Sequence, residues 1–206
     1  IFGISRQRIM MSMMIATAFL SMWIANVTAA VMMFPIAMSI ISKEEETISG
    51  KSNFGTGLML AIAYSATLGG LATLIGTPTN LILIGILEKL FPEAPPITFF
   101  TWLKIGVPLL IVFLPVFCFY LIRYFGVSGN LSQNDTIIKD ELKSLGPITP
   151  GEKRVIYVCL LAIFGWVFRD DLLLGNFVIP GWASVLGLGD YVHDSTVAIA
   201  AAMLLF

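Results

Sequence analysis

The chain has 206 residues, of which 57% are hydrophobic and only 12% are charged, and its formal net charge is −1. A soluble domain carries roughly 25% charged residues, so the composition indicates an integral membrane protein. The near-neutral charge gives no basic surface that would indicate nucleic-acid binding. An enzyme is not indicated either, because no nucleophile, base and oxyanion donor occur together in the apolar blocks.

Five apolar blocks follow one another along the chain, and a membrane-spanning helix needs about 20 apolar residues. The third and fourth blocks fit one span each. The first two blocks have 34 and 35 residues, which is too long for one ordinary span. The blocks are Ile9–Ser42, Thr56–Leu90, Phe99–Tyr124, Val155–Phe168 and a run that starts near Ser195.

Polar residues interrupt the first block at "SMWIANVT", where Asn26 and Thr28 lie among apolar residues and Ser21 precedes them. An amide in hydrocarbon needs a compensating partner, so broken helices lie buried in protein or beside a wet cavity. We expect a re-entrant hairpin with its tip at this stretch. The alternative is that Asn26 and Thr28 only form hydrogen bonds across packed helices.

The second block contains Gly69, Gly70, Gly76 and Pro78, which disfavour a continuous helix. We expect two half-helices joined by an unwound turn, or, as the alternative, glycines that only allow close packing. Freed carbonyl and amide oxygens suit a sodium ion, and half-helix N-termini suit carboxylates. Two discontinuous helices that meet at the membrane midplane are typical of a secondary transporter.

Loop charges indicate how the blocks cross the membrane. With the first block as a re-entrant hairpin, nine Lys and Arg residues lie on one side and three on the other. The positive-inside rule then places the hairpin ends and the 126–153 loop in the cytoplasm. A single crossing by the first block weakens this asymmetry. We expect a multi-pass protein of the cell membrane, the inner membrane if the source is bacterial.

The later segments are read from their polarity. "TPGEKR" predicts a helix start with Thr149 as N-cap and Pro150 at the first helical position. The apolar runs at both ends of the chain predict that it is a fragment of a longer protein. The expected segments are a hairpin over 1–42, a cytoplasmic connector over 43–55, a broken transmembrane helix over 56–92, a transmembrane helix over 97–125, a cytoplasmic linker over 126–153, a transmembrane helix over 154–170, an outer interfacial segment over 171–194 and the start of a truncated transmembrane helix over 195–206.

Two stretches, "MWIANVTAAVMMFPIA" and "AYSATLGGLATLIGTPTNLI", resemble the divalent-anion/sodium symporter family, which carries dicarboxylates, citrate or sulfate. "FTWLKIGVPLLIVFLP" and "LGPITPGEKRV" resemble it too, so the resemblance covers essentially the whole chain. It implies an all-α membrane fold of two inverted repeats, of which this chain shows the first hairpin, its broken helix and the opening helices of the second repeat. It also implies sodium-coupled symport of di- or tricarboxylates by an elevator-like shift of the hairpin domain, in a homodimer within the lipid bilayer.

The resemblance also implies the roles of particular residues. Asn26 binds both sodium and substrate, Ser21 and Gly76 offer carbonyl oxygens to sodium, and Thr77 contacts the substrate carboxylate through its hydroxyl and amide. Ala25 completes the sodium set. No cofactor is implied beyond sodium as the coupling ion, and the residues expected to support the site are Thr28, Pro78, Thr79 and Asn80.

The chain departs from the family signature beside Asn26, because Ser-Asn-Thr reads Ala25-Asn26-Val27 here. Both flanking hydroxyls are lost, and a lost hydroxyl that bonded the substrate costs roughly 1–3 kcal/mol. Thr28 lies about 100° further round a helix and cannot replace the missing threonine. One alternative function is therefore a sulfate or other anion transporter of the same architecture. Because the chain shows only part of the two repeats, the other alternative is a truncated remnant that does not transport.

Overall fold

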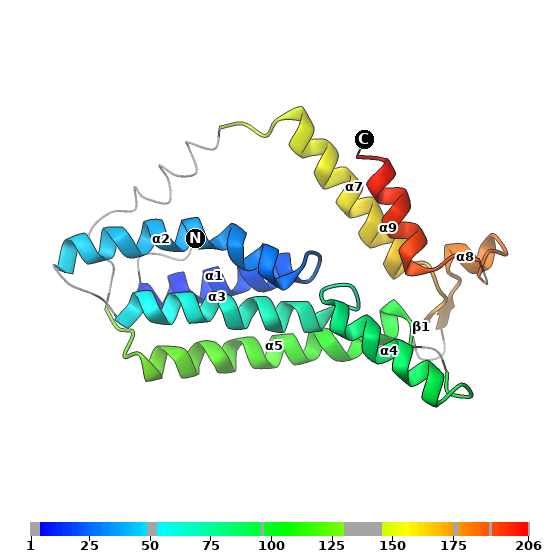
Figure 1. Cartoon of the computed structure of the whole chain (residues 1–206), viewed down its shortest axis with the longest axis horizontal. Coiled ribbons are helices and arrows are strands. Elements are labelled where there is room, and N and C mark those ends of the chain that lie inside the picture. The colour runs from blue at the N-terminus through cyan, green and yellow to red at the C-terminus, as the bar shows by residue number, and fades with distance from the viewer. Residues whose placement is uncertain are drawn as a thin grey trace. The chain divides into compact units, whose positions relative to one another are not determined.

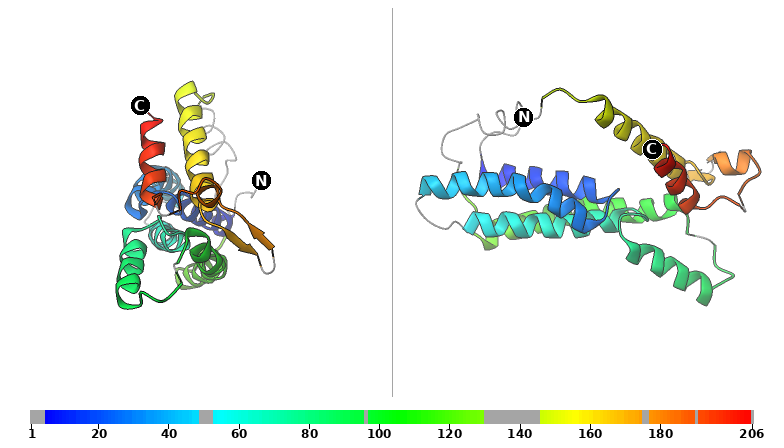
Figure 2. Two further views of the ribbon diagram at one scale, coloured as in Figure 1. Left: turned by 90° about the vertical axis from the view of Figure 1, so that its right-hand side faces the viewer. Right: turned by 45° about the horizontal axis from the view of Figure 1, so that its top comes forward.

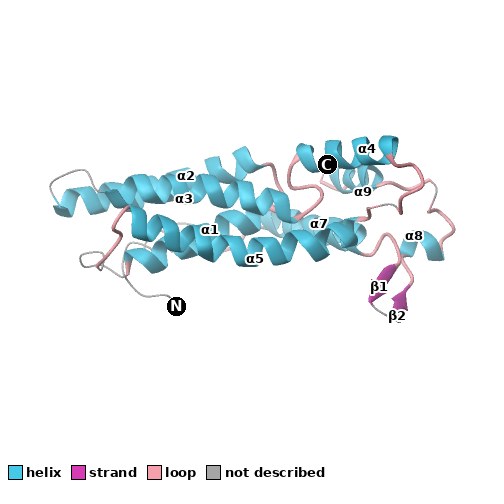
Figure 3. Ribbon diagram, turned by 90° about the horizontal axis from the view of Figure 1, so that it is seen from below, coloured by secondary structure: helices cyan, strands magenta, loops and turns pink. Residues whose placement is uncertain are grey.

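The computed structural model describes residues 5–48, 53–95, 97–129, 146–174, 177–189 and 191–205. Helices account for most of these residues, and one short two-stranded sheet accompanies them (Figure 3). The mostly helical architecture agrees with the predicted class. The chain forms two compact units, one of residues 1–97 and 101–140 and the other of residues 98–100 and 141–206.

The first unit begins with a helical hairpin. Helices α1 (Arg6–Ser21) and α2 (Asn26–Ile48) are joined by a turn over residues 22–25, and they lie side by side against α3 (Figure 1). The chain therefore turns back at "SMWIANVT", where the sequence predicted a hairpin tip. Helix α2 extends through residues that were expected in the connector. Its residues 26–45 are long and apolar enough to cross a membrane, so a re-entrant course stays a prediction.

The predicted broken helix is present as α3 (Asn53–Ala72) and α4 (Pro78–Leu90), separated by an unwound turn over residues 73–77. Thr77 is the N-cap of α4 in an extended conformation, and Pro78 occupies the first helical turn. Proline is well tolerated there because the first N–H groups of a helix have no partner within it. The break therefore falls at "GTPTN", as the sequence predicted.

Two of the glycines assigned to this break do not contribute to it, because α3 continues through Gly69 and Gly70. A Cβ atom on Gly69 would lie 2.2 Å from the carbonyl oxygen of Ala18, and one on Gly70 would lie 2.0 Å from the side-chain amide of Asn26. Their role is close packing of α3 against the hairpin. The packing alternative is therefore right for this pair, whereas Gly76 lies in the break.

Helix α5 (Phe99–Tyr124) runs beside α3 in the views of Figures 1 and 2. A Cβ on Gly106 would lie 2.4 Å from the carbonyl oxygen of Ala72, and the indole nitrogen of Trp102 donates to Leu71 at 3.0 Å. The helices of this unit enclose an apolar core that includes Met10, Met14, Leu58, Cys118 and Leu121.

Three helices within the described ranges are long and apolar enough to cross a membrane: residues 26–45 of α2, residues 53–72 (α3) and residues 99–124 (α5). Helix α7 (Pro150–Val167), which was expected to span, is not one of these three, and Glu152, Lys153 and Arg154 occupy its start. Its crossing of a membrane stays a prediction.

Polar contacts tie the open end of the hairpin together. The Arg6 Nε atom lies 2.8 Å from Glu44 Oε1, so the ion pair joins the start of α1 to the end of α2. Arg6 Nη1 donates to the carbonyl oxygen of Ser128 at 2.8 Å, and Gln7 Nε2 donates to that of Val127 at 3.0 Å. The segment that follows α5 is thereby fixed to the same end of the hairpin.

The second unit contains α7, whose predicted start is confirmed. The Thr149 hydroxyl accepts a hydrogen bond from the Glu152 amide at 3.3 Å, and the Thr149 amide donates to the Glu152 carboxylate at 2.7 Å. This reciprocal capping box satisfies two amides that the helix itself leaves unpaired. The remaining elements are β1 (Leu172–Leu174), β2 (Phe177–Ile179), α8 (Trp182–Val185) and α9 (Asp194–Met203).

Strands β1 and β2 form an antiparallel hairpin in which Leu172 pairs with Ile179, and it occupies part of the segment predicted as interfacial. Arg169, just after α7, lies 2.7 Å from carboxylate oxygens of both Asp170 and Asp194. The second of these ion pairs joins the end of α7 to the start of α9. Residues 130–145, most of the predicted cytoplasmic linker, lie outside the described residues.

Candidate functional site

The two helix breaks meet inside the first unit. The Thr73 hydroxyl donates to the carbonyl oxygen of Met22, which joins the second break to the first. The side-chain amide of Asn26 comes within 3.3 Å of the carbonyl oxygen of Gly76. A Cβ on Gly76 would lie 3.0 Å from the carbonyl oxygen of Ser21. Three of the four residues predicted to bind sodium, Ser21, Asn26 and Gly76, are therefore neighbours.

One of the two terminal atoms of the Asn26 side-chain amide faces oxygen atoms. This terminal atom lies 2.9 Å from the Ser21 hydroxyl and 3.3 Å from the carbonyl oxygens of both Ala66 and Gly76. With the amide nitrogen in this place, Asn26 donates to these oxygens. With the amide oxygen there, the group becomes a cluster of oxygens, with the Ser21 hydroxyl donating to Ala66 at 2.6 Å. The orientation of this one amide therefore decides whether a hydrogen-bonded network or a cluster of oxygen atoms lies here.

The turn between α3 and α4 is held by a buried amide. Asn80 is only 3% exposed, and its side-chain nitrogen donates to the carbonyl oxygens of Gly70 at 2.9 Å and Thr73 at 2.8 Å. These carbonyls lie where the α3 ladder ends, so helix hydrogen bonds no longer satisfy them. Asn80, predicted as a supporting residue, therefore fixes the turn that presents Gly76.

Two helix N-termini lie at this junction, because α2 begins at Asn26 and α4 begins at Pro78. Each carries unpaired backbone N–H groups and the positive end of a helix dipole. Thr77 is half-buried at the N-cap of α4, and its side chain makes no capping hydrogen bond. The junction therefore brings clustered oxygen atoms and the N-termini of two helices together.

The other predicted residues lie at the edge of this junction. Ala25 is exposed, and its carbonyl oxygen already accepts the Ala29 amide at 3.0 Å as the first hydrogen bond of α2. Val27, at the position of the family threonine, is 74% exposed. An exposed position is shared by the supporting residues Thr28, Pro78 and Thr79.

Sequence reasoning missed two residues of the junction. Thr73 is fully buried and bonds Met22 and Gly76, and Gly70 leaves the room in which the Asn26 amide lies. Thr17 is also a buried threonine, so residue type alone does not single out Thr73. Its position three residues before Gly76, where "GTPTN" begins, is the signal that could have found it.

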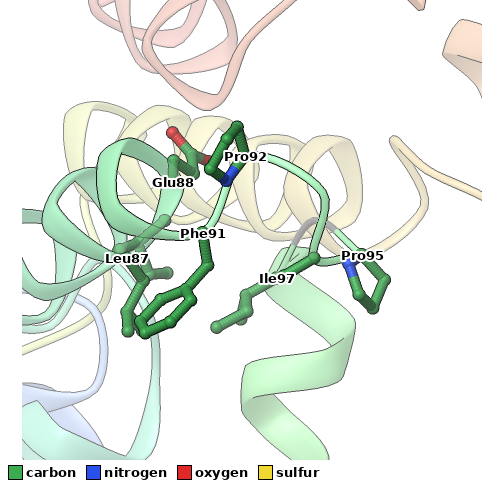
Figure 4. Close-up of a pocket in the computed structure, with 8 residues that line it drawn as sticks. Leu87, Glu88, Phe91, Pro92, Pro95 and Ile97 are labelled. Carbon is green, nitrogen blue, oxygen red and sulfur yellow. The ribbon is translucent and has the colours of Figure 1, made fainter.

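A separate apolar cavity of about 410 Å³ lies at the other end of α4. Figure 4 shows the side chains of Phe91 and Ile97 facing one another across it, with Glu88 beside Pro92. None of the residues predicted to bind sodium or substrate lines this cavity. It is therefore distinct from the junction of the two breaks.

Paired helix breaks that present backbone oxygens and helix N-termini to one point are the kind of site that secondary transporters use. The whole chain, residues 1–206, matches the family model described as "Citrate transporter", and the chain belongs to this family. The divalent-anion/sodium symporter resemblance seen in the sequence is confirmed by this match and by the relatives.

Two relatives carry the same printed name, sodium-dependent dicarboxylate transporter SdcS. The protein from Staphylococcus saprophyticus is 38% identical over 213 residues, and that from Staphylococcus aureus strain NCTC 8325 is 35% identical over 213 residues. In both cases the match covers 99% of this chain and 38% of the relative. The chain therefore spans well under half the length of these relatives, which are transporters by name. The family and the three membrane-length helices support a membrane location.

Proposed function

We propose that the protein is a sodium-coupled transporter of di- or tricarboxylate anions and that the junction of the two helix breaks is its sodium and substrate site. The observation that carries this proposal is the convergence of Ser21, Asn26 and Gly76 from two separate helix breaks. The names of the two relatives support sodium as the coupling ion and dicarboxylates as substrates, and the description of the family model supports citrate.

Sodium is a hard cation, and neutral oxygen ligands compensate its lost hydration without needing a buried carboxylate. The carbonyl oxygens of Ser21 and Gly76 and the amide oxygen of Asn26 are such ligands. Sodium entry would turn the Asn26 oxygen toward the Gly76 carbonyl, because a cation attracts the oxygen that the carbonyl repels. With the amide nitrogen in the same place, Asn26 donates to the Gly76 carbonyl at 3.3 Å instead.

The anion would be held from the helix side of the same junction. The N-termini of α2 and α4 offer amides and positive dipole ends, which favour carboxylate binding. The hydroxyl of Thr77, which makes no capping hydrogen bond, adds a hydrogen-bond donor. Sodium binding increases the positive potential at this point, so the anion binds more tightly once sodium is bound. The anion in turn strengthens sodium binding by the same factor, because linkage between two binding sites acts equally in both directions.

An elevator-like movement is the transport step that this arrangement favours. All residues of the proposed site belong to the first compact unit, so they would move together without being rebuilt. The ion pair between Arg6 and Glu44 holds the open end of the hairpin within that unit. We propose that this unit carries the bound ions across the membrane, in a homodimer whose scaffold includes residues of the second unit.

The test is uptake of labelled succinate by the intact protein in proteoliposomes, with an inward sodium gradient and with an equal potassium gradient as the control. Sodium-stimulated succinate uptake that unlabelled citrate or fumarate reduces is the expected result. Uptake of sulfate and not of succinate would show that the protein transports the other class of anion. Succinate uptake at the same rate in both gradients would show that transport is not coupled to sodium.

A further inference from the structure

Thr73 is the first residue of the turn between α3 and α4, and its side chain is fully buried. Its hydroxyl donates to the carbonyl oxygen of Met22 and accepts a hydrogen bond from the Gly76 amide at 3.1 Å. Its own carbonyl oxygen accepts from the side chain of Asn80 at 2.8 Å. One residue therefore contacts both helix breaks and the amide that braces one of them.

The two partners of this hydroxyl are adjacent to the proposed sodium ligands. Met22 follows Ser21, so the peptide group held through the Met22 carbonyl directly follows the peptide group that carries the Ser21 carbonyl. The Gly76 amide belongs to the residue whose carbonyl faces Asn26. A hydroxyl can donate one hydrogen bond and accept another, and both capacities of Thr73 are used in joining the breaks.

We propose that Thr73 is a positioning residue that sets the distance between the two helix breaks, and thereby the affinity of the junction for sodium. It touches neither ion nor anion in this role. The inference rests on the proposed function, because it concerns the same sodium site. Its physical basis is that ion ligands must be held near their binding geometry by surrounding hydrogen bonds, or affinity falls.

Thr73→Val keeps the shape of the side chain and removes only the hydroxyl. The Met22 carbonyl then loses the Thr73 hydroxyl, and the Gly76 amide keeps only its longer hydrogen bond to the Thr73 carbonyl oxygen at 3.4 Å. The direct hydrogen bond between the two breaks is lost, and a polar group left without its partner is costly. The sodium concentration that gives half-maximal uptake should rise about tenfold, which corresponds to about 1.4 kcal/mol. The KM for succinate at saturating sodium should change by less than about twofold, because the anion-binding amides are intact.

The matched control is Thr17→Val. Thr17 is also fully buried, but its hydroxyl donates only to the Met13 carbonyl oxygen, at 2.7 Å within α1. Thr17→Val therefore removes the same atoms from the same unit without touching either break. Thr73→Ser retains the hydroxyl and should restore the sodium dependence of the unchanged protein. A general packing defect would instead affect both valine variants and would not be relieved by serine.

The experiment measures sodium-dependent uptake in proteoliposomes and, on the same purified proteins, the rise in melting temperature on adding sodium. The expected result is a shifted sodium dependence in both assays for Thr73→Val alone. Equal sodium dependence in Thr73→Val and Thr17→Val would overturn the inference. If Thr73→Val does not reach the membrane, Thr73→Ala and Thr17→Ala replace the pair with the same expected difference. An unchanged protein that ignores sodium in both assays contradicts the proposed function itself.

Discussion

The side chain of Asn26 lies in the space that a Cβ atom on Gly70 would occupy, with 2.0 Å between that atom and the Asn26 amide. The hairpin tip therefore rests directly on the backbone of α3. This contact explains why a helix can contain glycine at residue 70, although glycine in a helix interior costs about 1 kcal/mol relative to alanine. The small residue is needed for the approach of the hairpin and not for the turn that follows.

Gly70→Ala should displace Asn26 and reduce sodium-dependent uptake about tenfold or more, because a shift of a binding group by about 1 Å has effects of this size or larger. The control is Gly85→Ala in α4, where an added Cβ meets no atom within 4 Å. Uptake rates, normalised to the amount of reconstituted protein, provide the measurement. Similar uptake in the two variants would show that the contact does not set the position of Asn26.

Asn80→Ala removes the two hydrogen bonds that hold the carbonyls of Gly70 and Thr73. The Gly70 carbonyl loses the Asn80 donor, and the Thr73 carbonyl keeps only the Gly76 amide at 3.4 Å. The variant should therefore be destabilised by about 2–3 kcal/mol. The measurement is the melting temperature in detergent, with Thr79→Ala as the control because Thr79 is exposed in the same helical turn. A melting temperature of Asn80→Ala equal to that of the control would contradict this role.

The ion pair at the open end of the hairpin predicts a second stability effect. Glu44 is 3% exposed, and Glu44→Ala would leave the Arg6 guanidinium without its carboxylate partner. Loss of one member of a buried pair is strongly destabilising, and for this partly exposed arginine we expect about 2–3 kcal/mol. Glu88→Ala, at an exposed glutamate of α4, is the control. Equal melting temperatures for the two variants would show that the ion pair does not stabilise the protein.

Asp171 predicts a pH effect in the second unit. The Gly181 amide donates to its carboxylate at 2.8 Å, and this bond, with a contribution from Ser184, lowers the pKa of Asp171 below its ordinary value of 3.8. A lowered pKa in the folded state means that the carboxylate stabilises the fold above about pH 3.8 and that this contribution is lost as the pH falls through the lowered pKa. The melting-temperature difference between the unchanged protein and Asp171→Asn should be constant from pH 7 to 5 and diminish in stronger acid. A difference that grows on acidification would mean that the pKa is raised instead.

Part of this architecture could be predicted from local residue chemistry. Pro78 marks the second break because proline lacks an N–H, and Thr149 with Glu152 marks a helix start because their reciprocal hydrogen bonds are local. Gly69 and Gly70 misled the prediction, because glycine serves both an unwound turn and a close helix contact. Only the neighbouring helix decides between these roles. Residue type alone did not single out Thr73, because its role depends on Met22, which is 51 residues away.

The strands β1 and β2 show the same limit. Each has three residues, which is too short for an alternating pattern to distinguish a strand from an interfacial loop. Their pairing depends on the close return of the chain and not on the composition of either strand.

The central claim is that Asn26 connects the sodium and anion sites, whereas Thr28 only flanks them. Its most direct test is the rate of sodium-dependent succinate uptake by Asn26→Ala and Thr28→Ala in proteoliposomes, normalised to protein. Asn26 contacts the second break, and Thr28 is exposed. The account predicts at least a tenfold loss for Asn26→Ala, about 1.4 kcal/mol, and less than about a twofold change for Thr28→Ala. Equal, small effects of the two substitutions would place the site elsewhere.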